Sequence, residues 1–454
     1  GDILIVGVLD DSNATPMLNH IPQEQRLRFV KSIDWIDEAF ILEQDLIDFI
    51  VALKPETIVK GKEHEFKKNI ETDVIENYGG KLLFSAGESS FTFKETIHEM
   101  GNTEYSSITL PQKFLEQYGS NKEALTNLIG KFSDLSVCVI GDTIVDEYIH
   151  CDPLGMSQED PTLVVTPTNT DRFIGGGAIV ASHIKALGAN KVSFASVLGD
   201  DDMATFVHSE LSKTGVETIL LEDDSRPTTL KQRFRSRNKT LLRVNHLRQH
   251  QISVDLQTKL LHQLEGQLAD CNLLVFTDFN YGVLPQGLVD SLCEIASQKN
   301  ILVVADSQSS SQTGDISRFK GMTLIAPTEH EARIALKNTE DGLVVLAEKL
   351  KKQSHSKHVF ITLGEDGLLI HADAPKEGSF ITDRLPAFNL ASKDNAGAGD
   401  CLLAVAAMTL TIGGSIWECC YLGSLAAAIQ VGRLGNKPLS KNELKKVLSM
   451  NKQS

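Results

Sequence analysis

Apolar runs alternate with amphipathic stretches in the first part of the chain. The apolar residues of 1–8 and of 81–84 predict buried strands. Residues 23–33 and 44–53 instead carry apolar side chains at helical spacing. Because strands that alternate with helices usually form a parallel sheet, this pattern predicts an α/β domain over residues 1–93.

A second α/β pattern begins at residue 135 with the run LSVCVIGD and continues to about residue 450. The stretch between the two patterns is polar and mixed, which is typical of a linker with some helix. A chain of 454 residues is also too long for one ordinary domain. We therefore predict two domains, residues 1–93 and residues 134–450, joined by a linker over residues 94–133.

Composition and charge narrow the classes of partner. Hydrophobic residues make up 41% of the chain and charged residues 23%, as in soluble globular proteins. The formal net charge of −16 argues against nucleic acid or an anionic membrane surface as the main partner. A local group of basic residues can still hold a phosphate on such a protein.

The cysteines and the start of the chain bear on location. The seven cysteines include no CxxC pair, so neither a zinc site nor a disulfide framework is indicated. No apolar run is long enough to span a bilayer, and the first residues lack the layout of a signal peptide. We expect reduced thiols and a cytoplasmic protein.

The segment DNAGAGD, residues 394–400, carries the clearest chemistry. It enters the apolar, helix-forming run at residues 401–408. Its small residues allow backbone N–H groups to approach an anion, and the start of a helix adds a positive dipole end. Asp400, in the first helical turn, could take a proton from an attacking hydroxyl, while the amides stabilise a transferring phosphoryl group. The alternative is an ordinary helix cap after a glycine-rich turn, because short glycine motifs are common.

Six segments occur in the order found in one enzyme family. GAGD before an apolar helix resembles the signature of the ribokinase/PfkB carbohydrate kinases. The other segments that resemble that family are Gly141-Asp142 with Asp146, the run GGGA at 175–178, LGDD at 198–201, APTEHE at 326–331 and TLGEDG at 362–367.

The resemblance implies a three-layer ribokinase-like domain that binds ATP, Mg²⁺ and a sugar or sugar phosphate, and that forms a homodimer. It makes Asp400 the catalytic base, with an anion hole at Gly397, Ala398 and Gly399. It places ATP at Thr362, Gly364, Gly367, Thr328 and Glu331, of which Glu331 orders Mg²⁺ through water. The substrate-binding residues that it implies are Asp142, Asp146, Gly175, Gly176 and Asp278. Asp278 and Asp306 both follow apolar strands, where open α/β sheets bind ligands.

A basic segment points to the kind of acceptor. Lys231, Arg233, Arg235 and Arg237 occupy alternate positions, which share one face of a strand. They suit a substrate phosphate, and a solvated edge strand is the alternative. TLKQRFRSRN at 229–238, with SQEDP at 157–161 and VGRLG at 431–435, resembles the bacterial heptose 7-phosphate kinases within the family.

Several positions depart from that pattern. Ile179 and Thr328 each replace an Asn of the family, Gln308 replaces a Lys, and Ala396 replaces a Thr. Two alternatives therefore stay open: a kinase for another sugar or for a nucleoside, and a non-catalytic binding protein built from two altered domains. The retained glycines and Asp400 favour a kinase.

Residues 1–93 resemble the cytidylyltransferase-like adenylyltransferase of the heptose pathway. The likeness is carried mainly by LKPETIVKG at 53–61, with GGK at 79–81 and ESS at 88–90. The H-x-G-H motif of that family is absent and would precede Gly1, together with a first strand and helix. We expect a fragment at this end, and we expect no nucleotidyl transfer by residues 1–93.

Overall fold

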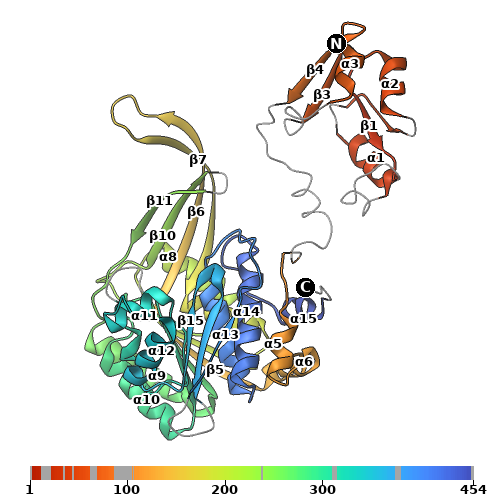
Figure 1. Ribbon diagram of the computed structural model, residues 1–454. Helices are drawn as coiled ribbons and strands as arrows, with labels where there is room; N and C mark the ends of the chain where they lie inside the picture. The colour runs from red at the N-terminus through yellow and green to blue at the C-terminus, as the bar shows by residue number, and fades with distance from the viewer. Residues whose placement is uncertain are drawn as a thin grey trace. The chain divides into compact units, whose positions relative to one another are not determined.

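The chain divides into two compact units, Gly1–Ile97 and His98–Ser454. The computed structural model describes residues 3–11, 22–33, 36–42, 45–61, 69–85, 105, 107–236, 239–308, 314–373 and 380–450 (Figure 1). Among these residues, no helix has the length and apolar character needed to cross a membrane.

The smaller unit contains two pairs of parallel strands in its described part. β1 (Ile5–Leu9) pairs with β2 (Glu38–Leu42), and β3 (Thr57–Gly61) pairs with β4 (Lys81–Ser85). The helices of the unit are α1 (Gln23–Lys31), α2 (Leu46–Leu53) and α3 (Glu71–Glu76). Asp45 begins α2, because its side chain accepts the N–H of Ile47 over 2.8 Å. The predicted alternation of strands and helices is present.

The larger unit is built on a nine-stranded sheet in the order β17-β16-β15-β14-β13-β12-β5-β8-β9. The strands from β9 to β15 pair in parallel, and β16 and β17 continue the sheet in antiparallel fashion. The central strands β5, β12 and β13 are almost wholly buried and mainly apolar, as expected for a sheet covered on both faces, and β12 and β13 end in polar residues. The bounds are β5 (Ser136–Gly141), β8 (Lys191–Leu198), β9 (Glu217–Glu222), β12 (Leu273–Asp278), β13 (Leu302–Ser307), β14 (Leu324–Ile325), β15 (His358–Thr362), β16 (Leu368–Asp373) and β17 (Phe380–Leu385).

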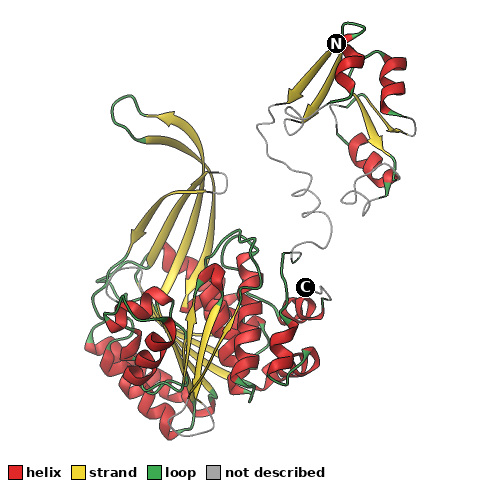
Figure 2. Cartoon of the chain, viewed as in Figure 1, coloured by secondary structure: helices red, strands yellow, loops and turns green. Residues whose placement is uncertain are grey.

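Helices cover both faces of this sheet, so the unit has the predicted three layers (Figure 2). One hydrophobic core lies under α7 (Gly177–Ala186), α8 (Asp202–Ser212), α13 (Ala398–Thr411), α14 (Ile416–Val431) and α15 (Lys441–Ser449). The core on the other face lies under α9 (Val254–Gln267), α10 (Gln286–Gln298), α11 (Glu329–Leu336) and α12 (Leu343–Ser354).

A second, four-stranded sheet projects from one end of the main sheet (Figure 1). Its order is β11-β10-β6-β7, and its bounds are β6 (Thr143–Met156), β7 (Leu163–Gly176), β10 (Thr229–Ser236) and β11 (Lys239–His246). β10 pairs in parallel with β6, which sets Lys231 opposite Asp146 and Arg233 opposite Tyr148. Arg237 lies outside the described residues.

The segment predicted as a linker is part of the larger unit where it is described. α5 (Gln112–Gln117) and α6 (Lys122–Gly130) pack on the main domain, and Leu125, Ile129 and Phe132 are wholly buried. The linker prediction is therefore wrong for residues 107–133. The four-residue spacing of Leu125 and Ile129 forms an apolar stripe that the many surrounding polar residues obscured.

Candidate active site

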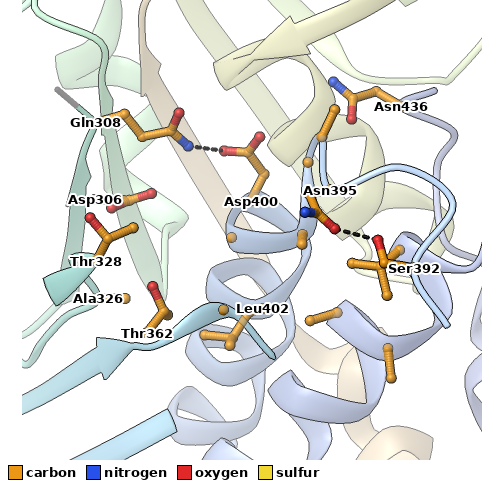
Figure 3. Close-up of a pocket in the computed structure, with 18 of the residues that line it drawn as sticks. Asp306, Gln308, Ala326, Thr328, Thr362, Ser392, Asn395, Asp400, Leu402 and Asn436 are labelled. Atoms are coloured by element: carbon orange, nitrogen blue, oxygen red, sulfur yellow. Dashed lines mark hydrogen bonds between the residues drawn. The ribbon is translucent and has the colours of Figure 1, made fainter. Parts of the chain in front are cut away.

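A cavity of about 440 Å³ opens between the main sheet, the small sheet and the start of α13 (Figure 3). Its size lies within the range of roughly 300–1,000 Å³ that is usual for small-molecule sites. The lining unites most of the residues that the sequence pointed to: Asp146, Gly176, Lys231, Arg233, Asp306, Gln308, Thr328, Glu331, Thr362, Gly364, Gly367, Gly397, Ala398, Gly399 and Asp400.

The beginning of α13 is shaped for an anion. Gly397 precedes the helix in the left-handed region, with φ of 75°, and a Cβ there would lie 2.0 Å from Asn436 Oδ1. Beside Gly399, in contrast, the space is open. No described side chain caps this helix, so its first N–H groups can serve a bound anion instead.

Asp400 lies in the first turn of α13 and is 6% exposed. Burial raises its pKa to about 7; the charges of Asp146 and Glu331 act in the same direction, and Lys231 opposes them. Gln308 Nε2 donates to Asp400 Oδ1 over 3.4 Å, as Figure 3 shows. A carboxylate whose pKa lies near neutral pH is suited to accept a proton from a hydroxyl.

The acidic side chains next to Asp400 fit a hydrated Mg²⁺. Asp306 Oδ1 is buried without a hydrogen-bond partner among the described residues. Burial, together with the charges of Glu331 and Asp400, raises the pKa of Asp306 well above its usual value. No three His, Cys, Asp or Glu side chains in the described part of the chain form a metal cage by themselves. Mg²⁺ commonly keeps several waters and uses substrate phosphates, so such a cage is not required.

The side of the cavity near β15 contains the residues predicted to bind the nucleotide. Thr328 begins α11 in a capping box with Glu331, and it forms an isolated β-bridge with Thr362. At Gly367, with φ of 93°, a Cβ would meet the carbonyl oxygen of Leu385 at 2.1 Å. Apolar side chains complete this side, among them Leu402, Ala427, Ala428 and Val431.

The opposite side of the cavity is polar and carries cations. Arg233 Nη2 donates to Asp146 Oδ1 over 3.2 Å, and Asn436 Nδ2 donates to Asp146 Oδ2 over 3.3 Å. The Lys231 ammonium lies 5.2 Å from the ring centre of Phe279. Gly175 makes room for the acid, since a Cβ there would lie 2.6 Å from Asp146 Oδ2.

Two predicted substrate contacts, Asp142 and Asp278, lie outside the cavity lining and are bonded to protein groups. Asp142 lies outside the cavity lining, and its carboxylate accepts backbone N–H groups from Phe279 at 2.7 Å and from Tyr281 and Val283 at 3.3 Å. Burial, followed by the charge of Asp278, raises the pKa of Asp142 to about 6. In this structure the Asp142 carboxylate therefore holds the loop after β12.

Asp278 is likewise taken up by protein groups. Its Oδ2 accepts from Ser307 Oγ over 2.8 Å and from Arg318 Nη2 over 2.9 Å, and it does not line the cavity. Ile179, the position where the family's Asn is missing, is wholly buried in the core under α7 and α13.

Three residues near the site escaped the sequence analysis. Tyr148 donates to Asp394, Asp394 also holds the turn at Gly435, and Asn436 lines the cavity. Asp394 belonged to the DNAGAGD segment, so its position was a usable signal. Nothing in the sequence pointed to Tyr148 or Asn436.

Comparison with known proteins decides the family. Residues 134–442 match the model of the pfkB family of carbohydrate kinases. The chain belongs to this family. As a pfkB carbohydrate kinase it uses ATP to phosphorylate a sugar. The matched range contains Asp400, the start of α13 and the residues that line the cavity.

Curated relatives agree with this assignment. The bifunctional protein HldE of Desulfatibacillum aliphaticivorans is 31% identical over 322 residues, which cover 70% of this chain and 64% of that protein. HldE of Campylobacter jejuni subsp. doylei is 32% identical over 68% of this chain and 64% of its own length. The pfkB kinase thus matches about 64% of the length of these relatives.

Solved structures show the same fold. Ribokinase of Thermotoga maritima superposes with a TM-score of 0.54 at 20% identity, over 70% of this chain and all of that one. Phosphofructokinase-2 of Escherichia coli, in complex with substrates and products, gives 0.55 at 16% identity over 69% of this chain and 98% of that one. The ribokinase-like fold class predicted from the sequence is confirmed.

Proposed function

We propose that this kinase phosphorylates a sugar phosphate, with heptose 7-phosphate as the candidate acceptor and Asp400 as the base. The observation that carries the proposal is the position of Asp400. Its buried carboxylate stands at the start of α13, in the same cavity as the cationic residues Lys231 and Arg233 and the acidic residues Asp306 and Glu331.

Different residues of the cavity have different roles in the proposed reaction. The acceptor hydroxyl gives its proton to Asp400 as its oxygen attacks the terminal phosphorus of ATP, and ADP leaves. Backbone N–H groups of Gly397, Ala398 and Gly399 stabilise the transferring phosphoryl group. Thr328, Thr362, Gly364 and Gly367 line the nucleotide side. Mg²⁺ supplies charge neutralisation when bound, and Asp306 and Glu331 would hold it through water.

The acceptor phosphate would be bound by Lys231 and Arg233. Both line the cavity on the side of Asp146, and the forked guanidinium of Arg233 suits a phosphate. The resemblance of residues 229–238 to the heptose 7-phosphate kinases supports this acceptor, as do the relatives named HldE.

ADP release with heptose 7-phosphate, mannose 6-phosphate and their unphosphorylated counterparts tests the proposal. Arg233→Ala should raise the acceptor KM about 10- to 100-fold and leave the ATP KM unchanged, because a lost charged hydrogen bond weakens binding by that order. Arg172→Ala is the matched control, because Arg172 pairs with Glu147 on the same sheet outside the cavity lining. A wild-type preference for the unphosphorylated sugars contradicts the proposal.

One observation favours a second candidate, a kinase for an unphosphorylated sugar or nucleoside. Arg233 is already paired with Asp146, so part of its charge is committed within the protein. In that case Asp146 and Arg233 would bind acceptor hydroxyls as a unit, and Arg233→Ala would weaken phosphorylated and unphosphorylated acceptors equally.

We propose further that the kinase is a homodimer assembled through the small sheet. Apolar side chains stand exposed on its strands, with Leu154 67%, Met156 63% and Leu242 56% exposed. Light scattering should give the mass of two chains, and Leu154→Glu with Met156→Glu should give the mass of one. A monomeric wild type contradicts this arrangement.

A further inference from the structure

Asn436 occupies an unusual position in the cavity wall. It follows α14 in the turn at Gly435, lines the cavity, and is only 6% exposed. In Figure 3, Asp400 lies between Gln308 and Asn436. A buried amide needs partners for both its ends, because burying an unpaired polar atom is costly.

One end of the Asn436 amide is satisfied by the protein. Nδ2 donates to Asp146 Oδ2 over 3.3 Å. Only the NH₂ end of an amide can donate to a carboxylate, so this bond fixes the direction in which the amide faces. Oδ1 must then point away from Asp146.

The other end has no partner in the described part of the chain. Oδ1 is buried and accepts no hydrogen bond from any described residue. It lies beside Gly397, where a Cβ would come within 2.0 Å of it. The glycine that begins α13 therefore also leaves space for this oxygen, within one turn of Asp400. A carbonyl oxygen held in this way is ready for a donor on a bound ligand.

We propose that Asn436 Oδ1 accepts a hydrogen bond from a hydroxyl of the acceptor sugar and so selects the sugar. The inference rests on the proposed function, in that the acceptor lies at the Asp146 end of the cavity. Sugar hydroxyls donate and accept at once, so one group can donate to Asn436 while it accepts from Lys231 or Arg233. Asp146, fixed by Arg233 and Asn436, keeps further lone pairs for a neighbouring hydroxyl.

The test pairs Asn436→Ala with singly deoxygenated acceptors. The parent sugar is whichever of heptose 7-phosphate, mannose 6-phosphate, fructose 6-phosphate and ribose gives wild type the highest kcat/KM. With that sugar, Asn436→Ala should lose about 10- to 100-fold in kcat/KM, as for a lost hydrogen bond. The ATP KM should not change. One deoxy analogue should show the same loss with wild type and no further loss with the variant, because both changes remove one interaction.

A positioning role through Asp146 predicts a different result. Asn436→Ala would then cost the same factor with the parent sugar and with every deoxy analogue, and that outcome overturns the inference. Asn395→Ala is the matched control, since Asn395 lines the same cavity but its Oδ1 already accepts from Ser392. Asn395→Ala should change kcat/KM by the same factor with the parent sugar and with every deoxy analogue.

Two further outcomes separate this inference from the proposed function. If ribose is the best acceptor, the sugar-phosphate assignment fails, while the deoxy-ribose series still tests Asn436. If none of the four sugars is phosphorylated, both fail. Should Asn436→Ala not fold, as judged by its melting curve, Asn436→Leu keeps the branched shape of the side chain but has no oxygen that can accept from the sugar. The same deoxy series then applies, and a loss independent of the sugar again overturns the inference.

Discussion

The Tyr148 hydroxyl donates a 2.7 Å hydrogen bond to Asp394 Oδ2 and so joins the small sheet to the loop before α13. The same oxygen accepts the N–H of Gly435 over 3.1 Å, and Oδ1 accepts the N–H of Ala396 over 3.1 Å. The Asp394 carboxylate, a few residues before Asp400, thus connects three segments: β6, the loop before α13 and the turn at Gly435. The position of the loop that carries Asp400 depends on all three.

Tyr148→Phe should lower kcat/KM for the acceptor about 3- to 10-fold, because it removes one hydrogen bond and keeps the ring. Steady-state kinetics with the acceptor and ATP varied separately measures the effect. Tyr421→Phe is the matched control: Tyr421 is also a wholly buried tyrosine, and its hydroxyl has no partner among the described residues. Equal losses in the two variants would show that the bond to Asp394 is unimportant.

Asp400→Asn should lower kcat by roughly 10²- to 10⁴-fold, the usual contribution of a positioned base. The amide keeps the size of the side chain but cannot take the proton. ATP binding, measured by calorimetry with a non-hydrolysable analogue, should change little, since the nucleotide side lies toward Thr362 and Gly367. A variant with near-normal turnover would show that Asp400 is not the base.

The raised pKa of Asp400 predicts a pH profile. The base must be ionised, so kcat/KM should fall about tenfold per pH unit below about pH 7 and level off above it. A profile that stays flat down to pH 5 would contradict this assignment.

Stability should change with pH in the opposite direction. The pKa of Asp400 rises from 3.8 to about 7 on folding, so between these values the folded state binds the proton more tightly. The contribution of Asp400 to stability is therefore fully present below its unfolded pKa and declines as pH rises toward 7. Asp400→Asn should remove this decline, so that its melting temperature gains on wild type between about pH 5 and pH 8. A constant difference would contradict the prediction.

Substitutions of Asp142 and Asp146 should have different effects, one on stability and the other on acceptor binding. Asp142→Ala leaves three buried loop amides without an acceptor and should cost about 2–4 kcal/mol of unfolding free energy, measured in denaturant. Asp146→Ala should act mainly on the acceptor KM, because Asp146 lines the cavity. If Asp142→Ala were as stable as wild type and impaired only in acceptor binding, the positioning role would be wrong.

The segment before the main sheet should influence ATP binding. The N–H of Thr109 donates to the Phe388 carbonyl over 2.8 Å, and Ile108 bridges to Asn389. Phe388 and Asn389 line the cavity near Ala428, whose carbonyl accepts from Asn389 Nδ2 over 2.9 Å. Thr109→Pro removes the donor and should raise the ATP KM several-fold, about 3- to 10-fold, without changing the acceptor KM. Thr109→Ala keeps the N–H and should behave as wild type.

The sequence predicted the residues of the candidate site whose chemistry is visible in the order of the chain. GAGD before an apolar helix predicted Asp400 and its loop, and alternation on one strand predicted that Lys231 and Arg233 face the same way. Strand-end carboxylates were ambiguous, because Asp142 can serve loop amides as readily as a substrate. Asn436 could not be predicted from the sequence, since only the packing of α13 against α14 brings it beside Gly397.

The family match and the folded unit begin at different points. The match starts at residue 134, whereas the core already includes Tyr105, Ile108 and Phe114. A fragment cut at the start of the match would contain every side chain to which we assign a catalytic role, but it would lack the residues that support one wall of the cavity. The family match gives the range of residues that share the family's chemistry. The packing of the core shows which further residues the smallest active fragment must include.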